Sequence, residues 1–149
     1  MIISAKYLMT GDGKTVLTDQ AVLTGEDGKI KKIGSKAELM QAYPEEEVKE
    51  YGDATILPGL CDMHVHLAYW FSQPDSFNYG PQLITLYALQ HAQAAFERGI
   101  TSVRDMSSAH GVCKNLKLAA EKGFVKIPRI THTDLGMCMS GGHAWDEVE

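Results

Sequence analysis

Two histidines one residue apart, His64 and His66, are the residues of this sequence best suited to chemistry. Side chains alternate along a strand, so both histidines point to one face, and Asp62 joins them there. Two imidazole nitrogens on one face can bind a single divalent ion at about 2.0–2.1 Å each. The spacing therefore predicts half of a metal site. The plainer interpretation is a pair of partly buried histidines that bond backbone carbonyl groups.

The surrounding residues predict the strand that positions this pair. Pro58 and Gly59 form a turn before it, and apolar residues alternate with the polar ones along it. We expect the apolar face to pack against helices; its members are Cys61, Met63, Val65 and Leu67. This context favours the metal site over the plainer interpretation.

Strands and helices alternate downstream of residue 57, which predicts βαβ units and a parallel sheet. We expect strands at 57–67, 100–105 and 129–133, with helices at 82–98 and 112–122. The first 56 residues are instead rich in strand signals. We expect a strand at 2–9, a turn at 10–13, a hairpin at 16–34, a helix at 36–43 capped by Ser35, and short strands at 48–51 and 55–57.

Residues 57–60 followed by 62–66 resemble the first barrel strand of the amidohydrolase superfamily. Residues 98–105 are similar to its second strand, and 136–144 to the Gly-Gly-His loop after its third. Together they resemble the imidazolonepropionase-like and Xaa-Pro dipeptidase (prolidase-like) branch. The resemblance implies an α/β fold: a β-rich composite β-sandwich unit at 1–56, then the first three βα units of a (β/α)8 TIM barrel at 57–149.

The resemblance also implies the site. His64 and His66 would ligate a catalytic divalent metal, expected to be zinc, with one or two ions in the complete enzyme. His143 would contact the substrate. In the family the other ligands, a lysine and further histidines, and the aspartate that acts as general base follow on later strands, beyond Glu149. No catalytic residue is therefore assigned within this chain.

The implied reaction is hydrolysis of a C–N bond in a peptide-like or cyclic amide substrate by metal-activated hydroxide, since a bound ion lowers the pKa of water to about 7. A dipeptidase-like enzyme is preferred because residues 103–106 and 129–130 match that branch better. The alternatives are an imidazolonepropionase-like cyclic amidohydrolase and a noncatalytic metal-binding or association module.

A TIM barrel takes roughly 200–400 residues. We therefore expect this chain to be inactive alone, to need the missing strands or other copies of itself, and to form a homo-oligomer.

Asp105 ends the second expected barrel strand, where it could accept a ring N–H from a ligand histidine. A helix cap or a salt bridge is the other interpretation.

The aromatic residues of the loop at 68–81 could wall a pocket, form an oligomer contact or pack beneath the loop. We expect His91 on the core face of its helix or at its edge, and Cys113 as a small buried hydrophobe.

Composition sets outer limits on function. The net charge is −5 and no basic stripe is present, which argues against a nucleic-acid partner. Three widely spaced cysteines indicate neither a disulfide framework nor a CxxC zinc site, so a reducing cytoplasm fits best. No apolar run approaches the roughly 20 residues of a membrane helix, and the start does not resemble a signal peptide.

Overall fold

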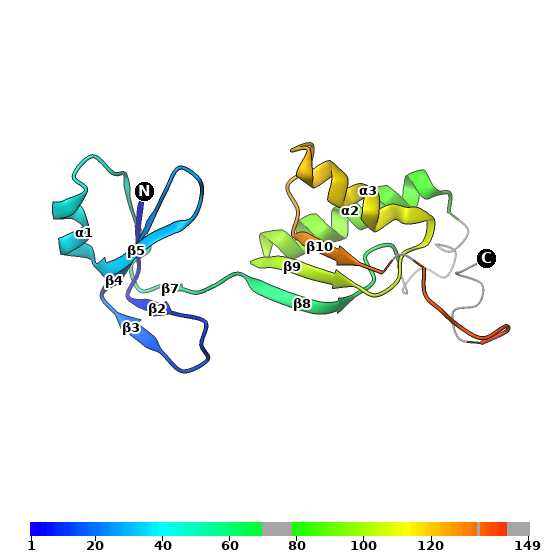
Figure 1. The fold of residues 1–149 in the computed structure, drawn as a ribbon, viewed down its shortest axis with the longest axis horizontal. Coiled ribbons are helices and arrows are strands. Elements are labelled where there is room, and N and C mark those ends of the chain that lie inside the picture. The colour runs from blue at the N-terminus through cyan, green and yellow to red at the C-terminus, as the bar shows by residue number, and fades with distance from the viewer. Residues whose placement is uncertain (70–78, 134, 143–149) are drawn as a thin grey trace. The chain divides into compact units, whose positions relative to one another are not determined.

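The computed structural model describes residues 1–69, 79–133 and 135–142. The chain divides into two compact units, Met1–Pro58 and Gly59–Glu149. Figure 1 shows that the first is built mainly of strands, whereas the second combines a sheet with two long helices.

Two small sheets and one helix make up the first unit. One sheet has the order β5-β4-β1-β6, with β5 Ile30–Ser35, β4 Gln20–Thr24, β1 Ile2–Ser4 and β6 Val48–Glu50. The other has the order β3-β2-β7, with β3 Val16–Thr18, β2 Tyr7–Met9 and β7 Thr55–Ile56. Helix α1 (Lys36–Ala42) closes a small core of Ile2, Ala21, Leu23 and Leu39.

The local signals of this unit are largely confirmed. Strands β4 and β5 form an antiparallel hairpin around the Asp27-Gly28 turn, and the Ser35 hydroxyl accepts a hydrogen bond from the Glu38 amide at 3.3 Å. The single strand expected at 2–9 is instead two strands, because the chain passes from one sheet to the other between them. Residues 16–18, expected in the β4–β5 hairpin, pair with β2. The passage back occurs at Asp19, whose φ of 55° breaks the strand.

The second unit contains the expected parallel sheet. Its order is β10-β9-β8, with β8 Leu60–Val65, β9 Ile100–Asp105 and β10 Arg129–His132, and both pairings are parallel. Helix α2 (Pro81–Glu97) connects β8 to β9. A short 3₁₀ turn, η2 (Ala109–Gly111), and helix α3 (Val112–Glu121) connect β9 to β10.

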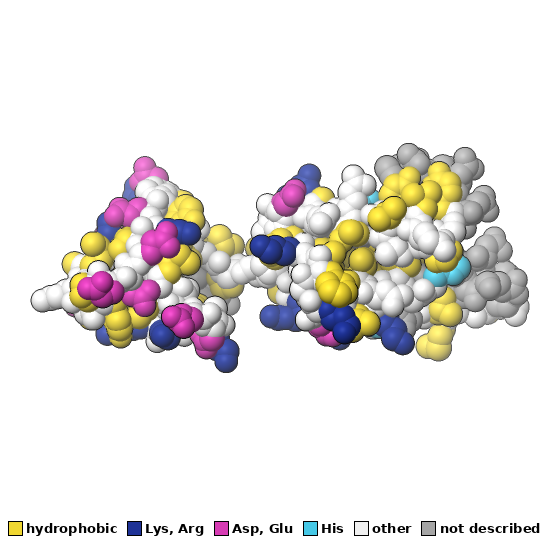
Figure 2. Space-filling view, turned by 90° about the horizontal axis from the view of Figure 1, so that it is seen from above, with side chains coloured by type: hydrophobic (Ala, Val, Ile, Leu, Met, Phe, Trp, Pro, Cys, Tyr) yellow, Lys and Arg dark blue, Asp and Glu magenta, His cyan; other side chains and the backbone are white. Residues whose placement is uncertain are grey.

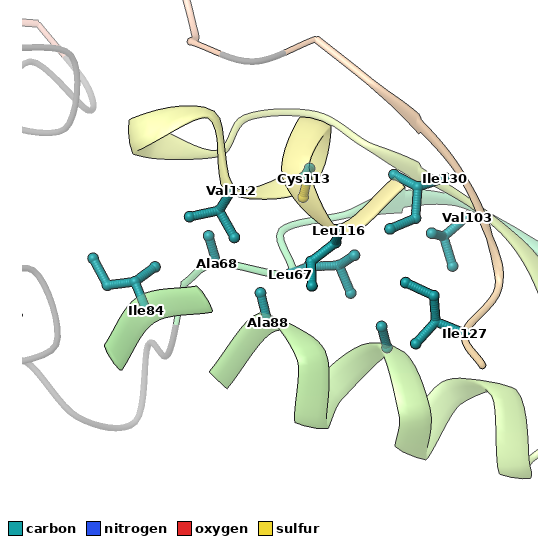
Figure 3. Close-up of a cluster of buried hydrophobic side chains, with 11 residues drawn as sticks. Leu67, Ala68, Ile84, Ala88, Val103, Val112, Cys113, Leu116, Ile127 and Ile130 are labelled. Atoms are coloured by element: carbon teal, nitrogen blue, oxygen red, sulfur yellow. The ribbon is translucent and has the colours of Figure 1, made fainter. Parts of the chain in front are cut away.

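The core of the second unit lies between the sheet and the two helices. Figure 3 shows side chains of α2, α3, β9 and β10 pointing toward one another, together with the residues that follow β8. The buried members are Leu67, Ala68, Ile84, Ala88, Ala92, Val103, Val112, Cys113, Leu116, Ile127 and Ile130. Burial of Cys113 agrees with the expectation of a small buried hydrophobe.

The described residues do not form a closed barrel. The parallel sheet has three strands, and β8 and β10 are its edges. Figure 2 shows hydrophobic side chains on the surface of this unit. Exposed apolar residues there include Leu60, Met63, Leu86, Leu118 and Phe124. None of the helices in the described ranges is long and apolar enough to cross a bilayer.

Candidate metal centre

The rings of His64 and His66 lie next to each other. His64 belongs to β8 and is exposed, whereas His66 follows the last residue of that strand and is half-buried. The ring centroids are 5.3 Å apart and the planes meet at 67°. The two side chains are therefore gathered at one place rather than splayed to opposite sides.

This place is the carboxyl edge of the parallel sheet. In the strand register Val65 pairs with Asp105, and Asp105 pairs with His132 on the other side. All three strands thus end at the level of His66. Ligands of parallel α/β sheets and barrels bind beyond this edge.

The ring of His66 is oriented by a backbone carbonyl group. Its Nδ1 lies 3.4 Å from the carbonyl oxygen of Ser107, a long hydrogen bond. A carbonyl oxygen only accepts, so Nδ1 is the donor in this contact. A histidine bound in this way presents Nε2 as a metal ligand.

The histidine pair fits a divalent cation. Two imidazoles that share one zinc ion at about 2.0–2.1 Å have ring centres roughly 5 Å apart when the angle at the metal is tetrahedral, close to the observed 5.3 Å. Zinc sites need at least three protein ligands. Within 1–69, 79–133 and 135–142, no group of three or more His, Cys, Asp or Glu could hold a metal ion. These residues therefore fit half of such a site.

The Asp62 side chain bonds the backbone of His64. Its Oδ1 accepts a hydrogen bond from the His64 amide at 3.1 Å. The register between β8 and β9 shifts between Asp62 and Val65. A register shift redirects side chains near a sheet edge, so simple alternation does not describe this end of β8.

The apolar face expected opposite the histidines is only partly present. Leu67 is buried and Val65 packs against the core, but Cys61 is exposed and 56% of Met63 is accessible. The expectation is wrong for Cys61 and Met63 because β8 is an edge strand, while α2 contacts β9 and α3 contacts β10.

Asp105 is fully buried and bonds groups other than an imidazole. Its Oδ2 accepts the Leu67 amide at 2.8 Å, and its Oδ1 accepts the Ser108 hydroxyl at 2.6 Å. The Ser108 oxygen also lies 3.0 Å from the Cys113 sulfur. The structure therefore contradicts one of the two interpretations of Asp105, that it accepts a ring N–H. The carboxylate caps the backbone after His66 instead.

His91 is half-buried on α2 and reaches the same backbone. Its Nδ1 lies 3.1 Å from the Leu67 carbonyl oxygen, and its ring stacks on Tyr87 at 6.5 Å between centroids. Tyr87 stacks in turn on Tyr79 at 6.0 Å. The helical stripe in the sequence placed His91 at the core face or edge but did not predict this bond. The Tyr87–His91 spacing of four residues was the one available signal.

His143, the expected substrate contact, lies outside the described residues, as do the aromatic residues Trp70, Phe71 and Phe77. The described aromatics of that loop, Tyr69 and Tyr79, are buried or packed against the core, as the packing alternative requires. The Tyr69 ring lies 5.8 Å from that of His66.

Residues 55–134, more than half of the chain, match the family model described as the Amidohydrolase family. The chain belongs to the amidohydrolase family. Among curated relatives, the imidazolonepropionase of Pyrobaculum arsenaticum is 35% identical over 83 residues, which are 50% of this chain and 21% of that protein. The 5-methylthioadenosine/S-adenosylhomocysteine deaminase of Thermodesulfovibrio yellowstonii is 32% identical over 69 residues, which are 45% of this chain and 16% of that protein.

Solved structures of amidohydrolases resemble nearly the whole of this chain. A Xaa-Pro dipeptidase with bound methionine has a TM-score of 0.72 and 28% identity, covering 96% of this chain and 35% of that one. A prolidase complexed with N-methylphosphonate-L-proline has a TM-score of 0.73 and 25% identity, covering 97% and 34%. This amidohydrolase chain thus spans about a third of its structural neighbours and about a fifth or less of these curated relatives.

Proposed function

We propose that this chain is the amino-terminal part of a metal-dependent amidohydrolase that cleaves a C–N bond in a peptide-like substrate, as a dipeptidase does. The observation that carries the proposal is the pair of imidazoles 5.3 Å apart at the carboxyl edge of a parallel sheet. The similarity to a Xaa-Pro dipeptidase along 96% of the chain supports the choice of substrate class.

In this proposal His64 and His66 hold the cation, expected to be zinc. Bound there, a divalent cation supplies Lewis-acid activation of water and of the scissile carbonyl group. His66 Nδ1 donates to the Ser107 carbonyl, so Nε2 would be its ligand atom, and Asp62 fixes the strand backbone that carries His64. His143 would contact the substrate.

The rest of the site has to come from outside the described residues. In this architecture residues 1–56 would contribute to a composite β-sandwich, and residues 57–149 would supply the first three βα units of a TIM barrel. The other metal ligands and the general base would come from later strands or from other copies of the chain in a homo-oligomer. The proposed compartment is the reducing cytoplasm, which would keep Cys61, Cys113 and Cys138 as thiols.

An imidazolonepropionase-like cyclic amidohydrolase is the second candidate. The observation that favours it is the 35% identity to the Pyrobaculum arsenaticum imidazolonepropionase over half of the chain. A third candidate is a noncatalytic module in which the histidine pair binds metal weakly or not at all and the exposed apolar surface serves association.

The test is a chimera of this chain with the remaining strands of a structurally similar Xaa-Pro dipeptidase. We expect bound zinc and hydrolysis of Xaa-Pro dipeptides, with little hydrolysis of imidazolonepropionate. Replacing His64 and His66 by alanine should lower the zinc content by at least one ion per chain, because both ligands of this half-site are removed. His110→Asn is the matched control, since His110 is an exposed histidine of the same unit.

Each alternative has its own outcome. Hydrolysis of imidazolonepropionate without dipeptide cleavage selects the cyclic amidohydrolase. A folded chimera that is metal-free and inactive on both substrates selects the noncatalytic module. Zinc content unchanged by the double alanine variant would remove both histidines from the ligand set.

A further inference from the structure

The residue that follows His66 is held from both sides by side chains of other elements. The Leu67 amide donates to Asp105 Oδ2 at 2.8 Å, and the Leu67 carbonyl oxygen accepts from His91 Nδ1 at 3.1 Å. Asp105 ends β9, whereas His91 lies on α2. Two separate elements therefore fix one residue next to a proposed metal ligand.

Asp105 also fixes the segment that orients the His66 ring. Its second oxygen accepts the Ser108 hydroxyl at 2.6 Å, and the neighbouring residue, Ser107, supplies the carbonyl that His66 Nδ1 contacts. One carboxylate thus ties together the backbone that carries the ring and the segment that carries its hydrogen-bond acceptor.

Because the Asp105 carboxylate is buried, losing its hydrogen bonds would cost free energy of folding. Asp105 and Ser108 have no exposed surface, and a buried carboxylate is strongly unfavourable unless its oxygens are bonded. Its Oδ2 is bonded by the segment that follows His66, and its Oδ1 by the segment that follows β9. If this position only filled space in the core, an apolar side chain would do so without the cost of burying a carboxylate.

We infer that Asp105 and His91 are positioning residues for His66, which act through the Leu67 backbone and the Ser107 carbonyl to hold the ring as the Nδ1–H tautomer with Nε2 facing the metal position. The inference rests on the proposed function in one respect, that His66 is a metal ligand. Neither positioning residue touches the metal or the substrate in this proposal.

The direct test reads the tautomer of His66 in the metal-free chain. Long-range ¹H–¹⁵N spectra of histidine-labelled protein at pH 8 distinguish the two neutral tautomers. We expect His66 of the parent chain to be mainly the Nδ1–H form and Asp105→Ala to shift it toward the Nε2–H form. His91→Phe keeps the aromatic ring beside Tyr87 but removes the bond to Leu67, so a smaller shift in the same direction is expected.

Two control variants separate positioning from general stability. Asp105→Asn has the same shape and keeps an acceptor oxygen for the Leu67 amide, so it should retain the parent tautomer. Cys113→Ala alters the far end of the same buried network, at the contact with Ser108, and should lower stability without changing the His66 tautomer.

Zinc affinity of the chimera is the second measurement. Loss of a group that orients a ligand typically weakens metal binding about 10–100-fold, and we expect Asp105→Ala to fall in this range and Asp105→Asn to remain near the parent. If Asp105→Ala does not fold, the His66 tautomer in His91→Phe tests the positioning role.

The two proposals fail in different ways. An unchanged His66 tautomer in folded Asp105→Ala and His91→Phe would overturn the positioning roles, whatever the zinc content. A tautomer shift in a protein whose chimera binds no zinc would support the positioning roles and overturn the proposed function.

Discussion

The two imidazoles of the candidate metal centre are held by different kinds of contact. At His64 the backbone amide is bonded by the Asp62 carboxylate, while the ring itself is exposed. At His66 the ring is bonded by the Ser107 carbonyl, and the next residue is fixed by Asp105. The structure therefore constrains His66 more closely than His64, so we expect the remaining ligands to fix the ring of His64.

A second carboxylate, Asp12, organises the turn between β2 and β3. Its Oδ1 accepts the amides of Lys14 and Thr15 at 2.9 and 2.7 Å, and its Oδ2 accepts the Thr15 hydroxyl at 2.5 Å. The Thr15 hydroxyl and then the two amides lower the pKa of Asp12 well below its ordinary value. Hydrogen bonds to the ionised form have this effect.

The lowered pKa predicts a pH dependence of stability. A carboxyl group whose pKa is lower in the folded state stabilises that state above its unfolded pKa of about 3.9, and the contribution is lost as the pH falls below that value. We expect Asp12→Asn to be less stable than the parent at pH 7 and the difference to shrink between about pH 4 and pH 2. Urea unfolding across this range measures it, and a difference independent of pH would contradict the assignment.

At the scale of elements, the approach of β8 to β9 depends on a glycine at the entry to β8. A Cβ atom added to Gly59 would lie 2.1 Å from Thr101 Oγ1 and 2.7 Å from Thr101 Cβ. Rotation of the threonine side chain cannot move its Cβ, so only a shift of one strand would relieve the clash. Glycine inside a strand region often marks such a close approach.

Gly59→Ala should therefore destabilise the second unit by about 1–3 kcal/mol, the usual range for overpacking. Thr101→Gly should recover most of the loss when combined with it, because the clashing atoms are gone. A double-mutant cycle by urea unfolding measures the coupling. Additive effects of the two changes would show that this contact does not set the strand separation.

At the scale of the whole molecule, each unit has its own hydrophobic core. Leu39 is fully buried in the core of Met1–Pro58, and Leu116 is 4% exposed in the core of Gly59–Glu149. Compact units with separate cores can unfold as separate cooperative units.

Matched substitutions test this independence. Leu39→Ala should cost about 2–5 kcal/mol in the first unit only, and Leu116→Ala a similar amount in the second only. Hydrogen exchange followed residue by residue reports the free energy of opening in each unit. Equal loss of protection in both units after either substitution would mean that the chain unfolds as one cooperative unit.

The sequence alone determined most of the elements and the position of the histidine pair. Helix α2, strand β9 and the hairpin at Asp27-Gly28 depend on local signals: periodicity, a glycine stop and turn residues. Strand alternation predicted that the His64 and His66 rings lie together, and they do, although a register shift interrupts that alternation at the end of β8.

Tertiary structure decided what holds the site together. The bonds from Asp105 and His91 to Leu67 join residues 38 and 24 positions apart, and no local pattern encodes such a pairing. The exposure of Cys61 and Met63 likewise depends on which helices cover β8. Local chemistry fixes where a strand begins and which side chains it carries, but packing between distant segments fixes which of those side chains are buried and which atoms they bond.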